Sequence, residues 1–63
     1  MQVSLKAARI NKNLLQKDVA AAVKVNKKTI SSWESGKTKP SVNKIDALCA
    51  VLGVSYDDIK WNA

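Results

Sequence analysis

Residues 16–36 read QKDVAAAVKVNKKTISSWESG, and this stretch predicts two short helices joined by a tight connection. Apolar side chains recur at helical spacing in its first half, which predicts a helix over about 16–23. Asn26 is a favourable N-cap for a second helix over 27–35, and Gly36 suits the residue that follows a helix. The side chains expected to hold the two helices together are Val19, Ala20, Val25, Ile30 and Trp33.

The second of these helices has two unlike faces. Ile30 and Trp33 lie three positions apart and share one face, which belongs in a core. The opposite face carries Lys27, Lys28, Ser31 and Ser32. A helix that is anchored on one side and basic on the other suits a DNA-reading helix-turn-helix, because its second helix must enter the major groove. The small Ala20 on the preceding helix would allow the close approach that this packing needs.

Further helices are predicted on both sides of this pair. One over 5–12 and another over 42–52 each follow a serine that can cap the first turn. Ser55 and Asp58 stand in capping-box register, which predicts a short fifth helix starting in SYDD. The predicted fold class is therefore all-α, a compact bundle of five short helices that forms one domain over residues 1–63.

The helix over 42–52 has a complete i, i+3, i+4, i+7 stripe, made of Ile45, Leu48, Cys49 and Leu52. We expect Cys49 to be a small buried core residue. It is the only cysteine and the chain has no histidine, which excludes a disulfide, the usual zinc sites and a Cys–His nucleophilic pair. Paired carboxylates and a phosphate-binding glycine loop are also lacking, so we expect no enzyme, no metal and no cofactor.

Positive charge is concentrated in the middle of the chain. Eleven basic and five acidic side chains give a formal charge of +6, and residues 24–44 hold six lysines against one acid, Glu34. This asymmetry indicates a polyanionic partner, nucleic acid before membrane. No apolar run approaches the roughly 20 residues of a membrane span. The N-terminus lacks a signal-peptide pattern, so we expect a cytoplasmic protein that does not bind membranes.

Over residues 5–59 the chain resembles the lambda-repressor-like helix-turn-helix family, also called the Cro/repressor or Xre type. The residues that carry the resemblance are Leu5, Arg9, Gln16, Val19–Ala20, Val25, Thr29–Ile30–Ser31, Glu34, Gly36, Lys39–Pro40 and the closing LGVS. The resemblance implies five helices and recognition of double-stranded DNA by the helix over 27–35. It also implies a homodimer on an operator with two-fold symmetry.

The family's contacts, carried over position by position, imply two sets of DNA-contacting side chains. Those expected to touch bases are Lys27, Lys28, Ser31 and Ser32. Those expected to touch phosphates are Gln16, Lys17, Asn26, Thr29, Lys37, Thr38 and Lys39. Family members with an arginine and a glutamate at the positions of Arg9 and Glu34 pair them. We therefore expect a structural ion pair there, with a phosphate contact by Arg9 as the alternative.

Two assignments stay open at the level of sequence. Lys27 and Lys28 oppose the dipole of their helix, which favours an anionic partner, but a lysine can bind either guanine or phosphate. Tyr56, Ile59 and Trp61 form an aromatic and apolar cluster near the C-terminus. This cluster either closes the core or forms a dimer surface.

Three residues depart from the family's pattern. Lys24 replaces a glycine that is often left-handed, and we expect modest strain there. Leu15 replaces the serine or threonine that usually caps the helix over 16–23, so that cap is lost. Asn13 stands where glycine is common.

The sequence is interpreted as a prophage- or plasmid-type transcriptional repressor, or the DNA-binding part of one, with no small-molecule ligand. The alternative is an antitoxin or another protein-interaction module on the same fold, in which DNA binding is secondary. Such a module would need an exposed apolar patch or an additional tail. Enzymatic and membrane-surface functions are poorly supported by these residues.

Overall fold

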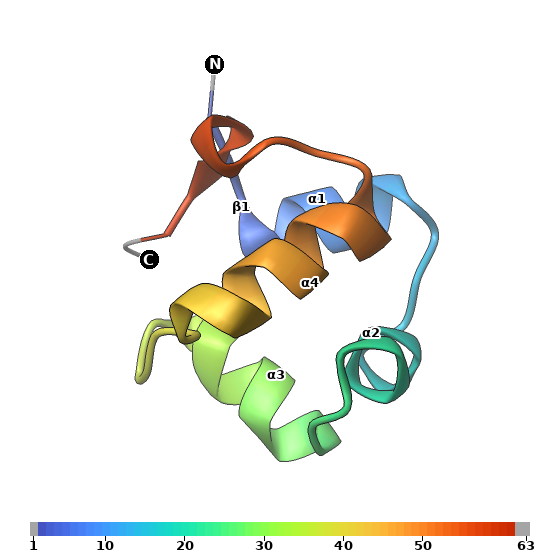
Figure 1. Cartoon of the computed structure of the whole chain (residues 1–63). Coiled ribbons are helices and arrows are strands. Elements are labelled where there is room, and N and C mark those ends of the chain that lie inside the picture. The colour runs from blue at the N-terminus through green and yellow to red at the C-terminus, as the bar shows by residue number, and fades with distance from the viewer. Residues whose placement is uncertain (1, 62–63) are drawn as a thin grey trace.

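The computed structural model describes residues 2–61, in which four α-helices surround one core (Figure 1). The elements in chain order are β1 (Val3–Ser4), α1 (Leu5–Asn11), α2 (Gln16–Val23), α3 (Lys27–Ser35), α4 (Val42–Leu52), a 3-10 turn η1 (Tyr56–Asp58) and β2 (Ile59–Lys60). The longest of these helices, α4, has 11 residues. No helix within the described part of the chain is long and apolar enough to cross a membrane.

The helices begin and end where the capping residues predict. The side-chain oxygens of Ser4, Asn26 and Ser41 accept backbone N–H groups in the first turns of α1, α3 and α4. Gly36 and Gly53 end α3 and α4 in the left-handed region, with φ of 81° and 66°. The predicted bounds of α2, α3 and α4 are confirmed, and α1 ends one residue earlier than expected.

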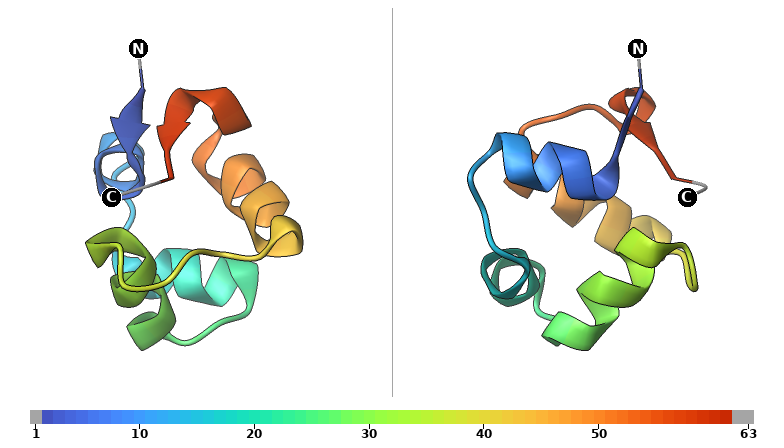
Figure 2. Two further views of the ribbon diagram at one scale, coloured as in Figure 1. Left: turned by 90° about the vertical axis from the view of Figure 1, so that its left-hand side faces the viewer. Right: turned by 180° about the vertical axis from the view of Figure 1, so that it is seen from behind.

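The prediction of five helices is wrong, because the described chain has four α-helices and a small sheet. Ser55 and Asp58 do start a helical turn, but it stops after three residues. The chain then becomes extended, and β2 pairs in parallel with β1, with Val3 opposite Ile59 (Figure 2). Ile59 is 1% exposed, so the extended backbone places its side chain in the core. Two-residue strands carry no alternation signal, which is why the sequence did not predict them.

The core draws on every helix and on β2. Its buried apolar residues are Leu5, Ala8, Val19, Ala20, Val23, Ile30, Trp33, Leu48, Leu52 and Ile59. The inner faces predicted for α2 and α3 are confirmed. Cys49 was expected to be buried, and this was wrong: it is half-buried at the edge of the α4 stripe, beside the fully buried Leu48.

Candidate nucleic-acid interface

A three-residue turn joins α2 to α3 and sets the direction in which α3 leaves α2. Lys24 ends α2 in the left-handed conformation expected at this position, with φ 61° and ψ 48°. The N–H of Val25 then donates to the carbonyl of Ala20 at 3.0 Å, and the half-buried Val25 side chain packs against the core. Asn26 follows and caps α3. Because Ala20 is only 4% exposed, a larger side chain there would push α2 and α3 apart.

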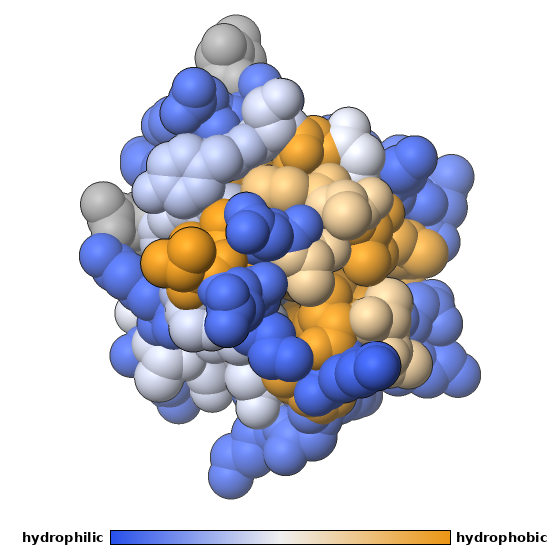
Figure 3. All heavy atoms as spheres, in the orientation of Figure 1, coloured by the Kyte–Doolittle hydropathy of each residue, from blue (hydrophilic) through white to orange (hydrophobic). Residues whose placement is uncertain are grey.

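The outer face of α3 is basic and polar. Lys27, Lys28 and Ser31 are exposed and Ser32 is half-buried. On the inner face, Ile30 is 1% and Trp33 is 8% exposed. In the space-filling view, hydrophilic side chains project from the lower end of the molecule, where α3 begins in Figure 1 (Figure 3). The helix therefore has one anchored face and one free face, as the sequence predicts.

The loop after α3 presents a second group of polar side chains. The N–H of Lys37 donates to the Ser32 carbonyl at 3.0 Å, which closes the end of the helix. Lys37, Thr38 and Lys39 are exposed, whereas Pro40 is buried. The loop is thus anchored at both ends while its middle remains free to contact a partner.

A buried ion pair connects α1 to the last turn of α3. Arg9 Nε lies 2.6 Å from Glu34 Oε2, and Arg9 Nη2 donates to Glu34 Oε1 at 3.2 Å. Arg9 Nη1 also donates to the carbonyl of Leu14 at 2.8 Å, so the guanidinium joins α1, α3 and the connection before α2. The Arg9 and Glu34 side chains are only 10% and 5% exposed. This geometry fits the structural pairing, because the guanidinium is occupied by protein acceptors.

Gln16, predicted to touch a phosphate, also takes part in this network. Its Nε2 donates to Glu34 Oε1 at 3.0 Å. One amide hydrogen is therefore used within the protein, and the other remains available because an amide nitrogen carries two. Gln16 is the first residue of α2, where free backbone N–H groups and the helix dipole favour an anion.

The remaining predicted phosphate contacts differ in how free their side chains are. Lys17 is exposed on α2. Asn26 Oδ1 accepts from both the N–H and the hydroxyl of Thr29, each at 2.9 Å. Asn26 could therefore bind a phosphate only through its amide nitrogen. The half-buried Thr29 already donates its hydroxyl hydrogen to Asn26.

Comparison with known proteins agrees with this arrangement of helices. The sequence model of a family described as helix-turn-helix matches residues 5–59, from the start of α1 to β2. The chain belongs to this family. Helix-turn-helix domains place their second helix in the major groove of DNA, so the match supports a DNA-binding role in transcription regulation.

A curated relative of this helix-turn-helix domain is the HTH-type transcriptional activator BcrR of Enterococcus faecalis. The two sequences are 33% identical over 55 residues, which is 87% of this chain and 27% of that protein. The chain thus spans about a quarter of the length of the relative.

Two contacts that position the helix-turn-helix were missed in the sequence. Lys44, counted only as part of the basic middle, donates from Nζ to the Val23 carbonyl at 2.7 Å and so caps the C-terminal end of α2 from α4. The Leu15 N–H donates to Asp18 Oδ2 at 2.9 Å. One of the two hydrogen bonds of a capping box is therefore present, although the bond from a side chain at position 15 is lost. An aspartate three residues after the N-cap predicts such a bond, so the sequence contained a signal for this contact. The lysine contact joins residues 21 positions apart and has no local signature.

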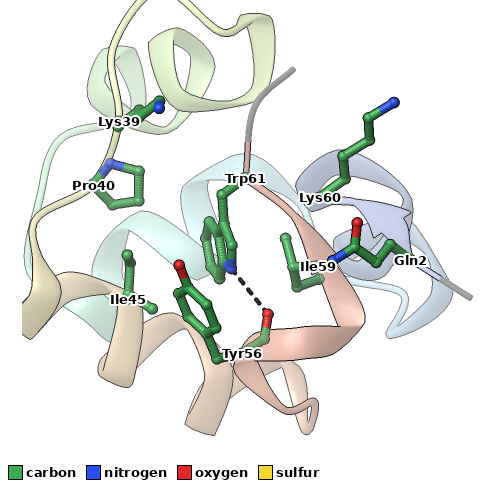
Figure 4. Close-up of a pocket in the computed structure, with 8 residues that line it drawn as sticks. All are labelled: Gln2, Lys39, Pro40, Ile45, Tyr56, Ile59, Lys60 and Trp61. Carbon is green, nitrogen blue, oxygen red and sulfur yellow. Dashed lines mark hydrogen bonds between the residues drawn. The ribbon is translucent and has the colours of Figure 1, made fainter.

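The C-terminal cluster of the helix-turn-helix domain divides between core and surface. Ile59 closes the core, while Tyr56 is 57% exposed and Trp61 is half-buried. Their rings stack with centroids 5.7 Å apart, and Trp61 Nε1 donates to the Tyr56 carbonyl at 3.0 Å (Figure 4). The pair forms one wall of a surface pocket of about 430 Å³, with Pro40 and Ile45 facing it and Lys39 and Lys60 at its sides (Figure 4).

Cys49 is the one thiol of this helix-turn-helix domain, and burial raises its pKa, assisted by the negative charges of Asp46 and Asp58. The thiol is therefore neutral at pH 7 and a poor nucleophile. Between residues 2 and 61, no three Asp, Glu, Cys or His side chains gather as metal ligands would.

Proposed function

We propose that this domain binds double-stranded DNA sequence-specifically and that α3 reads the major groove. The observation that carries the proposal is the exposed basic face of α3 on a helix whose other face is buried. Lys27 and Lys28 lie in the first turn, and Ser31 and Ser32 follow one turn later. A lysine that donates to guanine O6 and N7 would discriminate against the wrong base by about 1–3 kcal/mol.

Phosphate contacts on both sides of α3 would hold the domain in register on the duplex. The residues proposed for them are Gln16, Lys17, Asn26, Lys37, Thr38, Lys39 and Thr29, whose hydroxyl would have to turn from Asn26 Oδ1 toward the phosphate. The exposure of the lysines in this set and the formal charge of +6 support the proposal. At the start of α2, free backbone N–H groups would add to the contact made by Gln16.

Two copies of the domain would bind a palindromic operator as a homodimer, with half-sites about one helical turn apart. A dimer that covers a promoter would repress transcription, as expected of a phage-, prophage- or plasmid-type repressor. The relative from Enterococcus faecalis is named an activator, so the direction of regulation needs its own test. A promoter fusion that carries the selected operator decides between the two, by a fall or a rise in expression.

Selection from random duplex DNA at two salt concentrations tests the proposed function. We expect enrichment of a palindrome with half-site centres about 10 base pairs apart and an affinity that falls steeply with salt. Sedimentation of the complex should then give two protein chains per operator. Weak binding without enrichment of any sequence would contradict the proposal.

A second candidate function is protein binding, as in an antitoxin. The observation that favours it is an apolar surface over α4, visible in the centre of Figure 3. On this helix Ala50 is exposed, and Ala47, Cys49 and Val51 are half-buried. Substituting Ala50→Glu would abolish capture of a protein partner while leaving DNA affinity unchanged. If DNA binding is the main function, the same substitution has no effect on regulation by the domain.

A further inference from the structure

The pocket beside Tyr56 and Trp61 is built from segments that are far apart in the chain. The loop after α3 contributes Lys39 and Pro40 to one side, and Ile45 of α4 continues that side. The other wall is formed by Tyr56 of η1 and by Trp61, which follows β2 (Figure 4). Only the fold brings these segments together, so the expectation of no small-molecule ligand does not take this pocket into account.

The interior of the pocket is apolar and has the size of a small-ligand site. Its volume of about 430 Å³ lies within the range of about 300–1,000 Å³ that is usual for such sites. The Tyr56 and Trp61 rings stack with their planes 25° apart, and the hydrogen bond from Trp61 Nε1 to the Tyr56 carbonyl fixes the pair. A flat apolar group therefore fits between this wall and the buried Pro40.

The charge around the pocket is positive. Lys39 and Lys60 are exposed at its sides, and none of the eight described residues that line it is acidic. Asp57 and Asp58 follow Tyr56 in the chain but do not line the pocket, and Asp58 Oδ2 accepts the N–H of Ser55 at 2.9 Å. An apolar site with cations at its sides favours a ligand that combines an apolar body with a negative charge.

We propose that this pocket binds a small aromatic anion and that the bound ligand weakens DNA binding. The ring would lie against Tyr56 and Trp61, and the anionic group would pair with Lys39, while Lys60 adds to the positive potential. Lys39 is also proposed to contact a DNA phosphate, so an anion that pairs with it removes that contact. The effect on DNA rests on the proposed function, whereas binding of the ligand does not.

Titration with naphthoate tests the pocket without DNA. This probe has an aromatic body and a carboxylate that is ionised at pH 7. The controls are naphthylmethanol, which is neutral, and acetate, which has no ring. The sequence has two tryptophans, and of their indole N–H signals in a nitrogen–proton correlation spectrum only that of Trp61 comes from the pocket. We expect naphthoate to shift the Trp61 signal saturably and leave that of the buried Trp33 in place, and acetate to shift neither.

The same titration on variants tests the role of the charge. Naphthoate should bind the wild type about fivefold more tightly than naphthylmethanol, as for an exposed ion pair. Most of this preference should be lost in Lys39→Gln. The matched control is Lys37→Gln, which should keep the preference because Lys37 is exposed in the same loop but does not line the pocket. Equal melting temperatures of the two variants would exclude a difference in folding. Phenyl phosphate, titrated in parallel, distinguishes a phosphorylated ligand from a carboxylate by the tighter binding of one of them.

The effect on DNA is measured with the selected operator. Saturating naphthoate should lower the affinity of the wild type for the operator by about the factor by which Lys39→Gln lowers it, and naphthylmethanol should leave it unchanged. The affinity of Lys39→Gln should no longer respond to naphthoate. That of Lys37→Gln should still respond, because its Lys39 remains available to the ligand.

The outcomes separate the ligand site from the proposed function. If the Trp61 signal does not move up to the solubility limit of naphthoate, or if Lys39→Gln keeps the full preference for the anion, the ligand site is wrong while sequence-specific DNA binding stands. Saturable binding with unchanged operator affinity overturns the effect on DNA. If the domain binds no duplex at low salt, the proposed function is overturned, and the shift of the Trp61 signal still decides the ligand site.

Discussion

Arg9 and Glu34 are 25 positions apart in the chain, yet they form a nearly buried ion pair with Nε and Oε2 2.6 Å apart. The pair joins α1 to the last turn of α3. Since Gln16 donates to the same carboxylate, the start of α2 is tied to it as well. The orientation of the candidate reading helix therefore depends on a polar network and on apolar packing together.

Removing one partner of this pair should destabilise the fold strongly. We expect Arg9→Ala to lower the free energy of unfolding by about 3–5 kcal/mol, because Glu34 would remain buried without its counter-charge. For a domain this small, that is a large part of its stability. Urea denaturation measures the loss. A variant with wild-type stability and weakened DNA binding would instead assign Arg9 to a phosphate.

The two lysines at the start of α3 should affect base preference. We expect Lys27→Gln or Lys28→Gln to weaken operator binding by about 1–3 kcal/mol and to relax the preference at one base pair. Repeating the DNA selection with each variant measures both effects. Lys60→Gln is the matched control, since it removes an exposed charge from β2. Equal weakening on all sequences would mean that the lysine contacts phosphate only.

Lys24 is strained in the native state, which predicts a stabilising substitution. Its φ of 61° is left-handed, where a residue with a Cβ is destabilised by about 1–2 kcal/mol and glycine is not. We expect Lys24→Gly to stabilise the domain by about 0.5–1 kcal/mol, the remainder being offset by the greater freedom of glycine when unfolded. Asn13→Gly, at φ 59°, should gain less, because asparagine tolerates this region. A lower urea midpoint for Lys24→Gly would contradict this account.

Lys44 stabilises α2 from outside the helix-turn-helix. Its ammonium lies 2.7 Å from the Val23 carbonyl, at the end of α2 where the helix dipole favours a cation. We expect Lys44→Met to lower the free energy of unfolding by about 1 kcal/mol, through the lost hydrogen bond. Lys60→Met, which removes no such bond, should leave the thermal midpoint unchanged. Equal stability of the two variants would show that the Lys44 contact is not stabilising.

Cys49 should give the domain an alkaline stability limit. Burial raises its pKa above the ordinary value of 9.0, so the folded state binds the thiol proton more tightly than the unfolded state. The stabilisation is therefore complete below pH 9.0 and is lost as the pH rises through the folded-state pKa. In Cys49→Ala this component should vanish, which urea denaturation of both proteins at about pH 8 and 10 would detect. An identical pH dependence in the two proteins would contradict the raised pKa.

Much of this protein could be predicted locally. Capping residues and apolar spacing determine the four α-helices almost to the residue, because both signals act within one or two turns. The two faces of α3 follow from the same spacing. The residues of the candidate site could also be predicted from the sequence, because Lys27 and Lys28 lie in the first turn of a helix, where cations are otherwise unfavourable.

Only the tertiary structure decided the contacts between distant positions. The helical turn that begins at Tyr56 ends after three residues, where Ile59 pairs with Val3. The residues around Tyr56 carry no signal that predicts this pairing. Two further contacts likewise depend on how the helices pack. These are the hydrogen bond from Lys44 to the end of α2 and the position of Lys6 beside Gln16. The reason is physical: helix caps and faces are set by neighbours in sequence, whereas strand pairing and side-chain contacts between helices depend on which surfaces the folded core brings together.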